Sequence, residues 1–236
     1  MGIDKSAERI RQMFGEIAGQ YDRLNHLLSA GVDHWWRRQT VRLAPASGPG
    51  PVLDVCTGTG DLALAYWRAG PRSRMVVGSD FCRPMLALAR AKSRTAGASE
   101  RVMLVEADTE QLPFADNCFQ VVSIAFGLRN LSDPGRGLRE MARVCQPGGR
   151  VAVLEFGWPT WRPLRWVYGW YFERVLPRIG QALARNRQRA YYYLPASVHQ
   201  FPQRAALLRS MEQAGLREAR CHALTFGIAL LYIGIK

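Results

Sequence analysis

A glycine-rich loop after the first apolar segment carries the strongest chemical signal in this sequence. The segment and loop read Leu53-Asp54-Val55-Cys56-Thr57-Gly58-Thr59-Gly60-Asp61. Glycine has no Cβ, so the backbone can approach a ligand closely there, and a following helix presents free N–H groups at its N-terminus. Asp80 ends the next apolar segment about 20 residues further on, a placement that suits hydrogen bonds to both hydroxyls of a ribose. The pattern predicts a site for a nucleoside-bearing ligand.

The loop by itself leaves the ligand open. Gly58-x-Gly60-x-x-Ala63 is also compatible with the fingerprint of dinucleotide-binding proteins, so an NAD-dependent enzyme competes at this point. A tight turn that binds nothing would need the same glycines.

Later motifs separate these alternatives. The third apolar segment is followed by Ala107-Asp108-Thr109-Glu110-Gln111-Leu112-Pro113-Phe114, and a turn at Arg143-Val144-Cys145-Gln146-Pro147-Gly148-Gly149-Arg150 precedes the fifth. In this order the pieces resemble the class I methyltransferases from Asp54 to Arg150. The resemblance implies S-adenosyl-L-methionine as cofactor, with Asp108 and its neighbour at the adenine. The residues expected to bind it are Asp54, Gly58, Thr59, Gly60, Asp80, Asp108, Thr109 and Ala125.

The elements that must position these residues alternate between short apolar strands and helices. Strands are expected at Val52–Val55, Met75–Gly78, Val102–Val105, Val121–Ala125 and Val151–Leu154, and a closing pair at Arg217–Leu224 and Ile228–Ile235. Helices are expected near Leu62–Arg68, Pro84–Ser93, Pro134–Arg143 and Pro202–Ala214, with Asp133 as an N-cap. Alternating strands and helices predict βαβ units. The expected fold is α/β, Rossmann-like, with a mostly parallel seven-stranded sheet and helices on both faces.

Length predicts one domain, since 236 residues suit a single α/β core with modest additions. Two regions lie outside the alternating pattern: an N-terminal helical arm over residues 1–45, starting near Asp4, and an insert at about 157–200. Substrate specificity is expected there.

Composition narrows the class of protein. The five cysteines form no CxxC pair and read as reduced thiols, and the four separated histidines give no metal-binding spacing, so no metal is expected. No signal peptide or run of about 20 apolar residues is present, which predicts a cytoplasmic protein that does not span the membrane. The net charge of +13 is ambiguous, because a basic surface can bind nucleic acid or anionic lipid. The same charge can also reflect a GC-rich genome, which favours arginine.

Three further blocks are similar, nearly end to end, to the C-methyltransferases of menaquinone and ubiquinone biosynthesis. The first is Tyr21-Asp22-Arg23-Leu24-Asn25 with Ser29, Gly31 and Trp36-Arg37, and the second is Phe126-Gly127-Leu128-Arg129-Asn130-Leu131-Ser132-Asp133, continuing to Leu154-Glu155-Phe156. The third is Tyr191-Tyr192-Tyr193-Leu194 with Ser197, Phe201-Pro202, Met211, Ala214-Gly215, Gly227-Ile228-Ala229 and Gly234. Three positions depart from the family: Leu24 for Met, Tyr192 for Arg, and Ala125 for Ser.

The resemblance implies a reduced quinol ring with a polyprenyl tail as methyl acceptor. A ring carbon becomes nucleophilic as its neighbouring hydroxyl loses a proton. Arg129, with a pKa too high for a base, is expected to stabilise phenolate charge while Asn130 orients a ring oxygen. Water is the expected proton carrier. Tyr21, with Asp22, is expected on a lid over the substrate; for Tyr21 the alternative is packing, and for Arg129 a structural salt bridge.

The insert between Trp158 and Arg189 is rich in aromatic residues and arginine. This composition suits contact with the anionic inner face of the cell membrane. The alternative is that the aromatic residues pack in an ordinary core. The sequence allows a homodimer.

Rival functions are an RNA or DNA methyltransferase, for which no Asn-Pro-Pro-aromatic or Pro-Cys motif is present, and a non-catalytic cofactor-binding module. No nucleic-acid partner is expected. Between the two quinols, the short N-terminal arm favours demethylmenaquinol over the benzoquinol of the ubiquinone pathway.

Overall fold

The computed structural model describes residues 5–71, 74–184 and 190–236. Its strands are β1 (Val52–Val55), β2 (Val76–Asp80), β3 (Val102–Glu106), β4 (Phe119–Ala125), β5 (Cys145–Phe156), β6 (Arg217–Leu224) and β7 (Ala229–Ile235). They form one sheet in the order β3-β2-β1-β4-β5-β7-β6. The first five strands are parallel, and β7 is antiparallel to both β5 and β6. This confirms the Rossmann-like, mostly parallel seven-stranded sheet.

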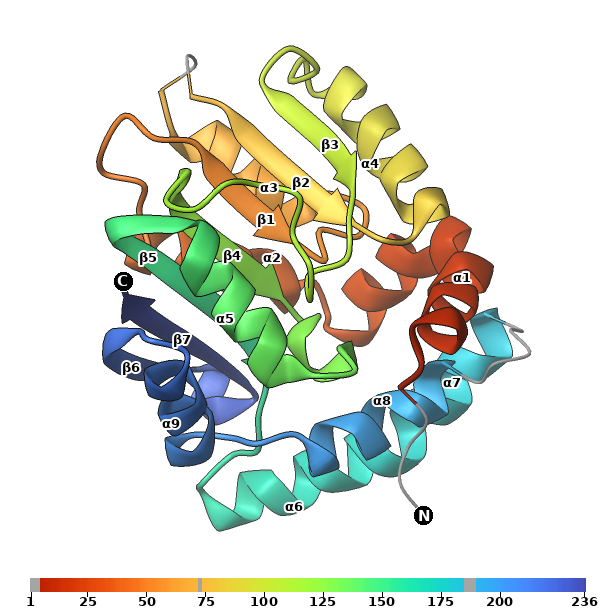
Figure 1. Ribbon diagram of the computed structural model, residues 1–236. Coiled ribbons are helices and arrows are strands. Elements are labelled where there is room, and N and C mark those ends of the chain that lie inside the picture. The colour runs from red at the N-terminus through yellow and green to blue at the C-terminus, as the bar shows by residue number, and fades with distance from the viewer. Residues whose placement is uncertain (1–4, 72–73, 185–189) are drawn as a thin grey trace.

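Helices cover both faces of the sheet, with α5 in front of it and α3 behind it in Figure 1. The α-helices are α1 (Ala7–Leu28), α2 (Val32–Leu43), α3 (Asp61–Ala69), α4 (Arg83–Thr95), α5 (Pro134–Val144), α6 (Arg162–Trp170), α7 (Leu176–Ala184), α8 (Ala190–Gln200) and α9 (Ala205–Gln213). Short 3₁₀ turns are η1 (Leu128–Asn130) and η3 (Thr225–Gly227), and a π-helical turn, η2 (Tyr171–Val175), joins α6 to α7.

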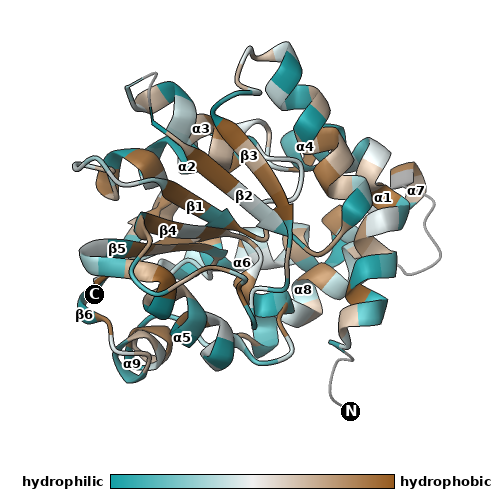
Figure 2. Ribbon diagram, turned by 45° about the horizontal axis from the view of Figure 1, so that its top comes forward, coloured by the Kyte–Doolittle hydropathy of each residue, from teal (hydrophilic) through white to brown (hydrophobic). Residues whose placement is uncertain are grey.

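Alternation along the strands divides the core between the two faces. Val52 packs with Leu62 and Tyr66 of α3, whereas its neighbour Leu53 packs with Leu138 of α5, as side chains of a strand point to opposite faces in turn. Figure 2 shows the strands as the most hydrophobic part of the ribbon, enclosed by helices with mixed surfaces. The sheet is thus buried on both sides, as a parallel sheet requires.

Helix starts agree with the residues expected to mark them. Asp133 is the N-cap of α5, and its side chain accepts a hydrogen bond from Arg136 N at 2.9 Å. Pro84 and Pro134 lie in the first turns of α4 and α5, where the missing N–H costs nothing.

Some expected boundaries are wrong. The expected strand Met75–Gly78 is observed as Val76–Asp80, and Asp80 ends it, as its place after the apolar segment predicted. β5 begins at Cys145, not Val151, because Phe119 pairs with Cys145 before the register shifts at Val121. Gly149 permits this irregularity, since a Cβ there would lie 2.7 Å from Gln120 O.

The two regions outside the alternating pattern, the N-terminal arm and the insert, pack against each other. Buried apolar residues of α1 share a second core with the insert helices α6, η2, α7 and α8; they are Ile10, Met13, Ile17, Leu24, Tyr168, Phe172, Leu176, Ala190, Tyr191, Tyr193 and Val198. In Figure 1 these helices lie together beyond the carboxyl ends of the strands. We call this unit the cap. Asp4 of the expected arm and Arg185, Arg187 and Arg189 of the insert lie outside the described residues.

Candidate active site

A cleft opens where the carboxyl ends of β1, β2 and β4 meet α1, the edge at which open α/β sheets bind ligands. We call it the cofactor cleft. Its lining includes five of the residues expected to bind the cofactor, Gly58, Asp80, Asp108, Thr109 and Ala125, and also Asn130 and Tyr21. Residues separated by more than 100 positions therefore converge as the sequence predicts.

Backbone geometry at the glycine loop suits a bulky ligand. Gly58 has φ +56°, a conformation that disfavours side chains, and open space lies where its Cβ would be. Gly127 also lines the cleft, and a Cβ on it would lie 2.6 Å from the Cβ of Cys56, so glycine is required at this position too. The loop leaves room for a ligand against the backbone.

Asp80 is the buried carboxylate of the cleft, and it already holds the loop. Its two oxygens accept hydrogen bonds from Gly58 N at 2.8 Å and Cys82 N at 2.9 Å. Burial raises the pKa of this carboxyl, and the backbone donors oppose that rise. A carboxylate has acceptor capacity left after two bonds, so Asp80 can also accept from ligand hydroxyls.

Asp108 stands at the exposed rim of the cleft, where its side chain accepts a hydrogen bond from Glu110 N at 2.9 Å. Thr109 is buried behind it, with its hydroxyl 3.3 Å from the sulfur of Cys56. This polar corner directly follows β3, at the carboxyl end of that strand.

Three expected cofactor residues do not line the cleft. Asp54 is buried beneath it, where it accepts hydrogen bonds from the hydroxyls of Thr57 at 2.6 Å and Ser123 at 3.0 Å. Burial raises the pKa of Asp54 to about 7. Gly60 has φ +85° and forms the N-cap of α3, where a Cβ would lie 3.1 Å from that of Ala89. Asp54 and Gly60 shape the loop from below.

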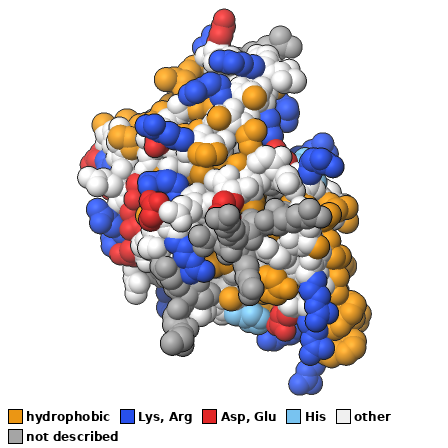
Figure 3. All heavy atoms as spheres, turned by 90° about the vertical axis from the view of Figure 1, so that its right-hand side faces the viewer, with side chains coloured by type: hydrophobic (Ala, Val, Ile, Leu, Met, Phe, Trp, Pro, Cys, Tyr) orange, Lys and Arg blue, Asp and Glu red, His pale blue; other side chains and the backbone are white. Residues whose placement is uncertain are grey.

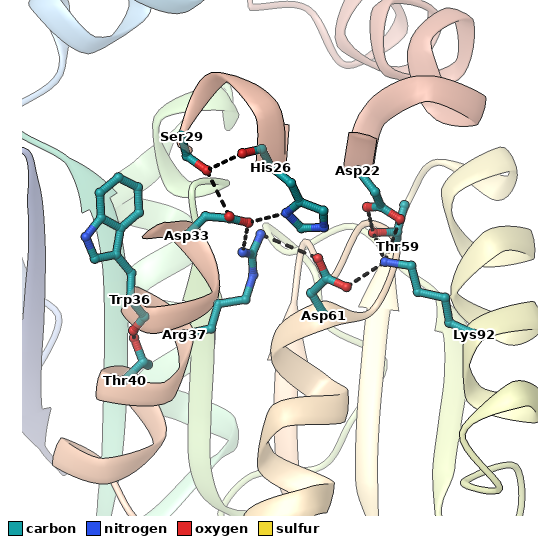
Figure 4. A network of polar contacts seen from close by, with 10 residues as sticks. All are labelled: Asp22, His26, Ser29, Asp33, Trp36, Arg37, Thr40, Thr59, Asp61 and Lys92. Carbon is teal, nitrogen blue, oxygen red and sulfur yellow. Dashed lines mark hydrogen bonds and ion pairs between the residues drawn. The ribbon is translucent and has the colours of Figure 1, made fainter. Parts of the chain in front are cut away.

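Thr59, the third, faces the cap. Its hydroxyl donates to Asp22 Oδ1 at 2.6 Å and accepts from Lys92 Nζ at 2.9 Å. Figure 4 shows these groups in a chain of polar contacts that continues through Asp61 and Arg37 to Asp33. We call this chain the latch, since it ties α1 and α2 to the glycine loop and α4. Asp22, expected near the substrate, belongs to the latch and lines neither the cleft nor the pocket behind it.

A second cavity, the inner pocket, lies between the cofactor cleft and the cap. It shares Phe14, Tyr21 and Phe126 with the cleft. Arg129 of η1 lines it, and Asn130 faces the cleft. The three residues expected to be catalytic, Arg129, Asn130 and Tyr21, therefore lie at the boundary between two cavities.

Arg129 forms a buried ion pair with the last acidic residue of β5. Its Nη1 lies 2.9 Å from Glu155 Oε2 and also donates to the carbonyl of Phe126. The backbone N–H of Arg129 donates to Glu155 Oε1 at 3.2 Å. Arg129 is thus not an isolated cation, yet within the described chain its Nε has no hydrogen-bond partner.

The whole chain matches a known family. The model of the ubiE/COQ5 methyltransferase family covers residues 3–236. The chain belongs to the ubiE/COQ5 methyltransferase family. It is 45% identical to the ubiquinone/menaquinone biosynthesis C-methyltransferase of Geobacter sp. strain M21 over 99% of both chains. It is 48% identical to the demethylmenaquinone methyltransferase of Thermus thermophilus, covering 94% of this chain and 99% of the relative.

Solved structures agree on the fold. An S-adenosylmethionine-dependent methyltransferase of Thermotoga maritima superimposes with a TM-score of 0.64 at 19% identity, over 95% of this chain and 98% of that one. Membership of the ubiE/COQ5 family and this fold confirm a methyltransferase that uses S-adenosylmethionine.

Sequence reasoning gave no role to several residues of this ubiE/COQ5 site. Arg37 lines the inner pocket, bonds to Asp33 at 2.5 Å and lies 3.7 Å from Asp61. Tyr193 donates to Asn130 Oδ1 at 3.2 Å and so fixes the amide. Arg37 and Tyr193 both occur in the motif blocks that resemble the family, but their roles depend on contacts with distant elements.

Proposed function

We propose that this enzyme transfers a methyl group to a ring carbon of a prenylated demethylmenaquinol. The observation that carries the proposal is the inner pocket, which adjoins the cofactor cleft and joins aromatic walls to a few polar groups. Phe126 and Phe156 pack with their ring centroids 4.4 Å apart and their planes tilted by 31°, and Tyr21 and Arg129 add polar groups. A flat aromatic ring with two oxygens matches such a lining. The name of the Thermus relative supports the same substrate.

S-adenosylmethionine supplies a methyl group that is already activated by its sulfonium. The protein must therefore align the acceptor carbon, exclude water and favour the phenolate form of the neighbouring hydroxyl. Burial raises the pKa of Tyr21, while Arg37 and Arg129 lower it. Its hydroxyl stays protonated at neutral pH and can donate to a ring oxygen.

Arg129 is assigned to the developing phenolate through Nε, the donor that Glu155 leaves free. Asn130, fixed by Tyr193, orients the ring from the cleft side. Both roles predict defects in turnover that leave cofactor binding intact.

A test of the role of Arg129 must take its buried ion pair with Glu155 into account. Arg129→Ala alone would leave Glu155 buried and unpaired, which costs about 3–5 kcal/mol of stability. The double variant Arg129→Gln, Glu155→Gln removes both charges. We expect it to bind S-adenosylmethionine normally by calorimetry and to lose about 10²-fold or more in kcat. Full turnover of the double variant with intact cofactor binding would remove Arg129 from the mechanism. The single variant Glu155→Gln is the control, because it shows how much of the loss in kcat comes from breaking the ion pair.

The direct test of the function is transfer from labelled S-adenosylmethionine, detected by mass spectrometry, to three acceptors in parallel: reduced demethylmenaquinol, a demethylated benzoquinol and bulk RNA. Label on the naphthoquinol alone, or faster there, is expected. A faster benzoquinol reaction would favour the ubiquinone pathway, and label on RNA alone would contradict the proposal.

We further propose that the insert rests on an anionic membrane, from which the acceptor enters. Trp161, Trp166 and Trp170 are 66%, 76% and 53% exposed along α6. Four exposed arginines accompany them, Arg162, Arg165, Arg174 and Arg178. Figure 3 shows hydrophobic and basic side chains side by side at the lower edge of the face that carries α1 and α7. No helix within the described residues is long and apolar enough to span a bilayer.

Flotation with anionic vesicles tests this contact. Trp166→Ser with Trp170→Ser should abolish flotation without lowering the melting temperature, because both rings are exposed in the free protein. Met103→Ser, at 53% exposure on β3, is the matched control. Equal flotation of all three proteins would contradict the proposal. Sedimentation of the protein without vesicles tests whether it forms the homodimer that the sequence allows.

A further inference from the structure

An apolar groove continues the inner pocket through the cap toward the surface. We call it the outer groove. The two cavities share six lining residues, Asn25, Ser29, Trp36, Phe156, Tyr191 and Leu194. Inner pocket and outer groove are therefore neighbouring parts of one space between α1, α2, β5 and α8.

Polarity changes sharply from one part to the other. The inner pocket includes Arg37, Asp33 and Arg129 in its lining. Among the described residues, the outer groove is lined by no charged side chain; beyond the shared residues its lining is chiefly Leu27, Leu28, Val32, Tyr168, Phe172, Leu176 and Ile228. A ligand that fills both parts must have a polar head and a long apolar extension.

Tyr191 stands at the boundary between the two parts. It is 3% exposed, and among the described residues its hydroxyl has no hydrogen-bond partner. Gly180 of α7 leaves room for the ring, since a Cβ there would come within 2.3 Å of a ring atom. A buried hydroxyl without a partner costs about 1–3 kcal/mol, so its retention at a ligand cavity points to a ligand oxygen as the missing partner.

The outer groove opens on the side of the cap. Leu27, in its wall, is 63% exposed, and Ala30 is exposed beside it. Its opposite wall is tied to α1 because the Tyr171 hydroxyl donates to Leu28 O at 2.8 Å. Tyr168 of α6 lines the groove, while Trp166 and Trp170 of the same helix are exposed. One helix thus forms both a wall of the groove and the surface assigned to the membrane.

We propose that the outer groove holds the first isoprene units of the acceptor and that the Tyr191 hydroxyl donates to the ring oxygen nearest the tail. The proposal rests on the function proposed above and extends it to the tail. The tail binds by burial of apolar surface. The hydrogen bond from Tyr191 is made to the quinol ring, so its contribution should not depend on the length of the tail.

Two variants separate these roles. Leu28→Trp adds bulk at a half-buried position that lines the outer groove only. Gln20→Trp, exposed on the same helix, controls for the added indole. Tyr191→Phe deletes only the Tyr191 hydroxyl. Each protein is assayed in detergent with a naphthoquinol lacking a tail and with one carrying two isoprene units.

We expect wild type and Gln20→Trp to favour the tailed acceptor in kcat/KM by about tenfold or more, as burial of several CH₂ groups allows. Leu28→Trp should lose that preference and keep wild-type kcat/KM on the tailless acceptor. Tyr191→Phe should lower kcat/KM about tenfold on both acceptors, the value of one buried hydrogen bond.

A second readout does not depend on methyl transfer. Quenching of protein tryptophan fluorescence by an already methylated naphthoquinone with two isoprene units should be weakened in Leu28→Trp and unchanged in Gln20→Trp. Equal rates of the wild type on both acceptors, or equal losses of Leu28→Trp on both, would overturn the groove assignment while leaving the proposed function intact. Wild-type rates for Tyr191→Phe would overturn the hydroxyl's role. Absence of transfer to either quinol by the wild type would instead refute the proposed function.

Discussion

At the scale of single residues, Asp80 and Asp54 show how two buried carboxylates near one loop differ in what they do. Asp80 lines the cleft and holds the loop, whereas Asp54 is enclosed beneath it by two hydroxyls. Asp80 should therefore contribute to ligand affinity. Asp54 should instead affect how the free energy of unfolding depends on pH.

Asp80→Asn should weaken binding of S-adenosylmethionine by about 10- to 100-fold, because hydrogen bonds to a charged acceptor contribute about 1.5–3 kcal/mol. Isothermal titration calorimetry measures the affinity. Glu212→Gln, an exposed carboxylate on α9, is the control. Unchanged affinity in Asp80→Asn would separate this carboxylate from the ligand.

Asp54 should make the folded state less stable as pH rises. Burial raises its folded pKa to about 7, above the unfolded value near 3.9. The folded state therefore binds more protons than the unfolded state between these values, and this group's stabilisation is lost as pH rises through 7. In urea unfolding, Asp54→Asn should become more stable relative to the wild type from pH 5 to pH 8. A difference that does not vary with pH would contradict the assignment.

At the scale of elements, the latch gives α1 and α2 a direct connection to the glycine loop. Lys92 of α4 lies 2.6 Å from Asp22 and 2.5 Å from Asp61, and it also donates to Thr59. The position of α1 and the glycine loop are thereby linked through one ammonium group.

Lys92→Met should loosen α1 and raise the dissociation rate of S-adenosylmethionine, since it leaves two carboxylates facing each other across the loop. Hydrogen exchange should be faster along α1 and unchanged along α9. Arg83→Met, which removes an exposed ion pair with Glu106, is the control. Unchanged exchange in α1 would show that apolar packing alone holds the cap.

Sequence reasoning succeeded at this scale where local patterns decide the outcome. The alternation of short apolar strands with helices predicted a mostly parallel sheet, and Asp133 and Pro134 mark a helix start by local chemistry. The π-helical turn η2 and the latch were not predictable in this way. Both depend on contacts between segments far apart in the chain, and the spacing of residues in one sequence gives no signal for such contacts.

The site follows the same division. Gly58, Asp80 and Asp108, which lie far apart in the chain, line one cleft because the strand ends of a parallel sheet converge. Thr59 and Asp22 were assigned to ligands but bond to each other, since the sequence does not tell which way a loop side chain turns. The hydroxyl of Tyr191, which has no partner in the described parts of the chain, likewise becomes visible only once the cap is packed.

At the scale of the whole molecule, the effect of the net charge of +13 on membrane binding depends on where the basic side chains lie on the surface. Basic residues near an anionic surface contribute about 1 kcal/mol each, a field that salt screens. The arginines of α6 to α7 should therefore govern membrane binding.

Arg165→Gln with Arg174→Gln should reduce vesicle flotation at low salt and make the remainder less sensitive to salt. Arg90→Gln with Arg94→Gln removes the same charge from α4 and should change flotation little, as α4 lies away from the exposed tryptophans. Equal loss in both pairs would mean that net charge alone drives binding.

The cap joins the first helix of the chain to helices near its end, and this has a consequence for synthesis. A ribosome makes α1 early, but Tyr168, Phe172 and Tyr191, which cover its apolar face, are made much later. The sheet from β1 to β5 can assemble in the meantime, leaving Ile10, Met13 and Ile17 bare on the nascent chain. A chain stalled before α6 would carry the strand ends and glycine loop of the cofactor cleft beside an uncovered helix, a species suited to capture by chaperones.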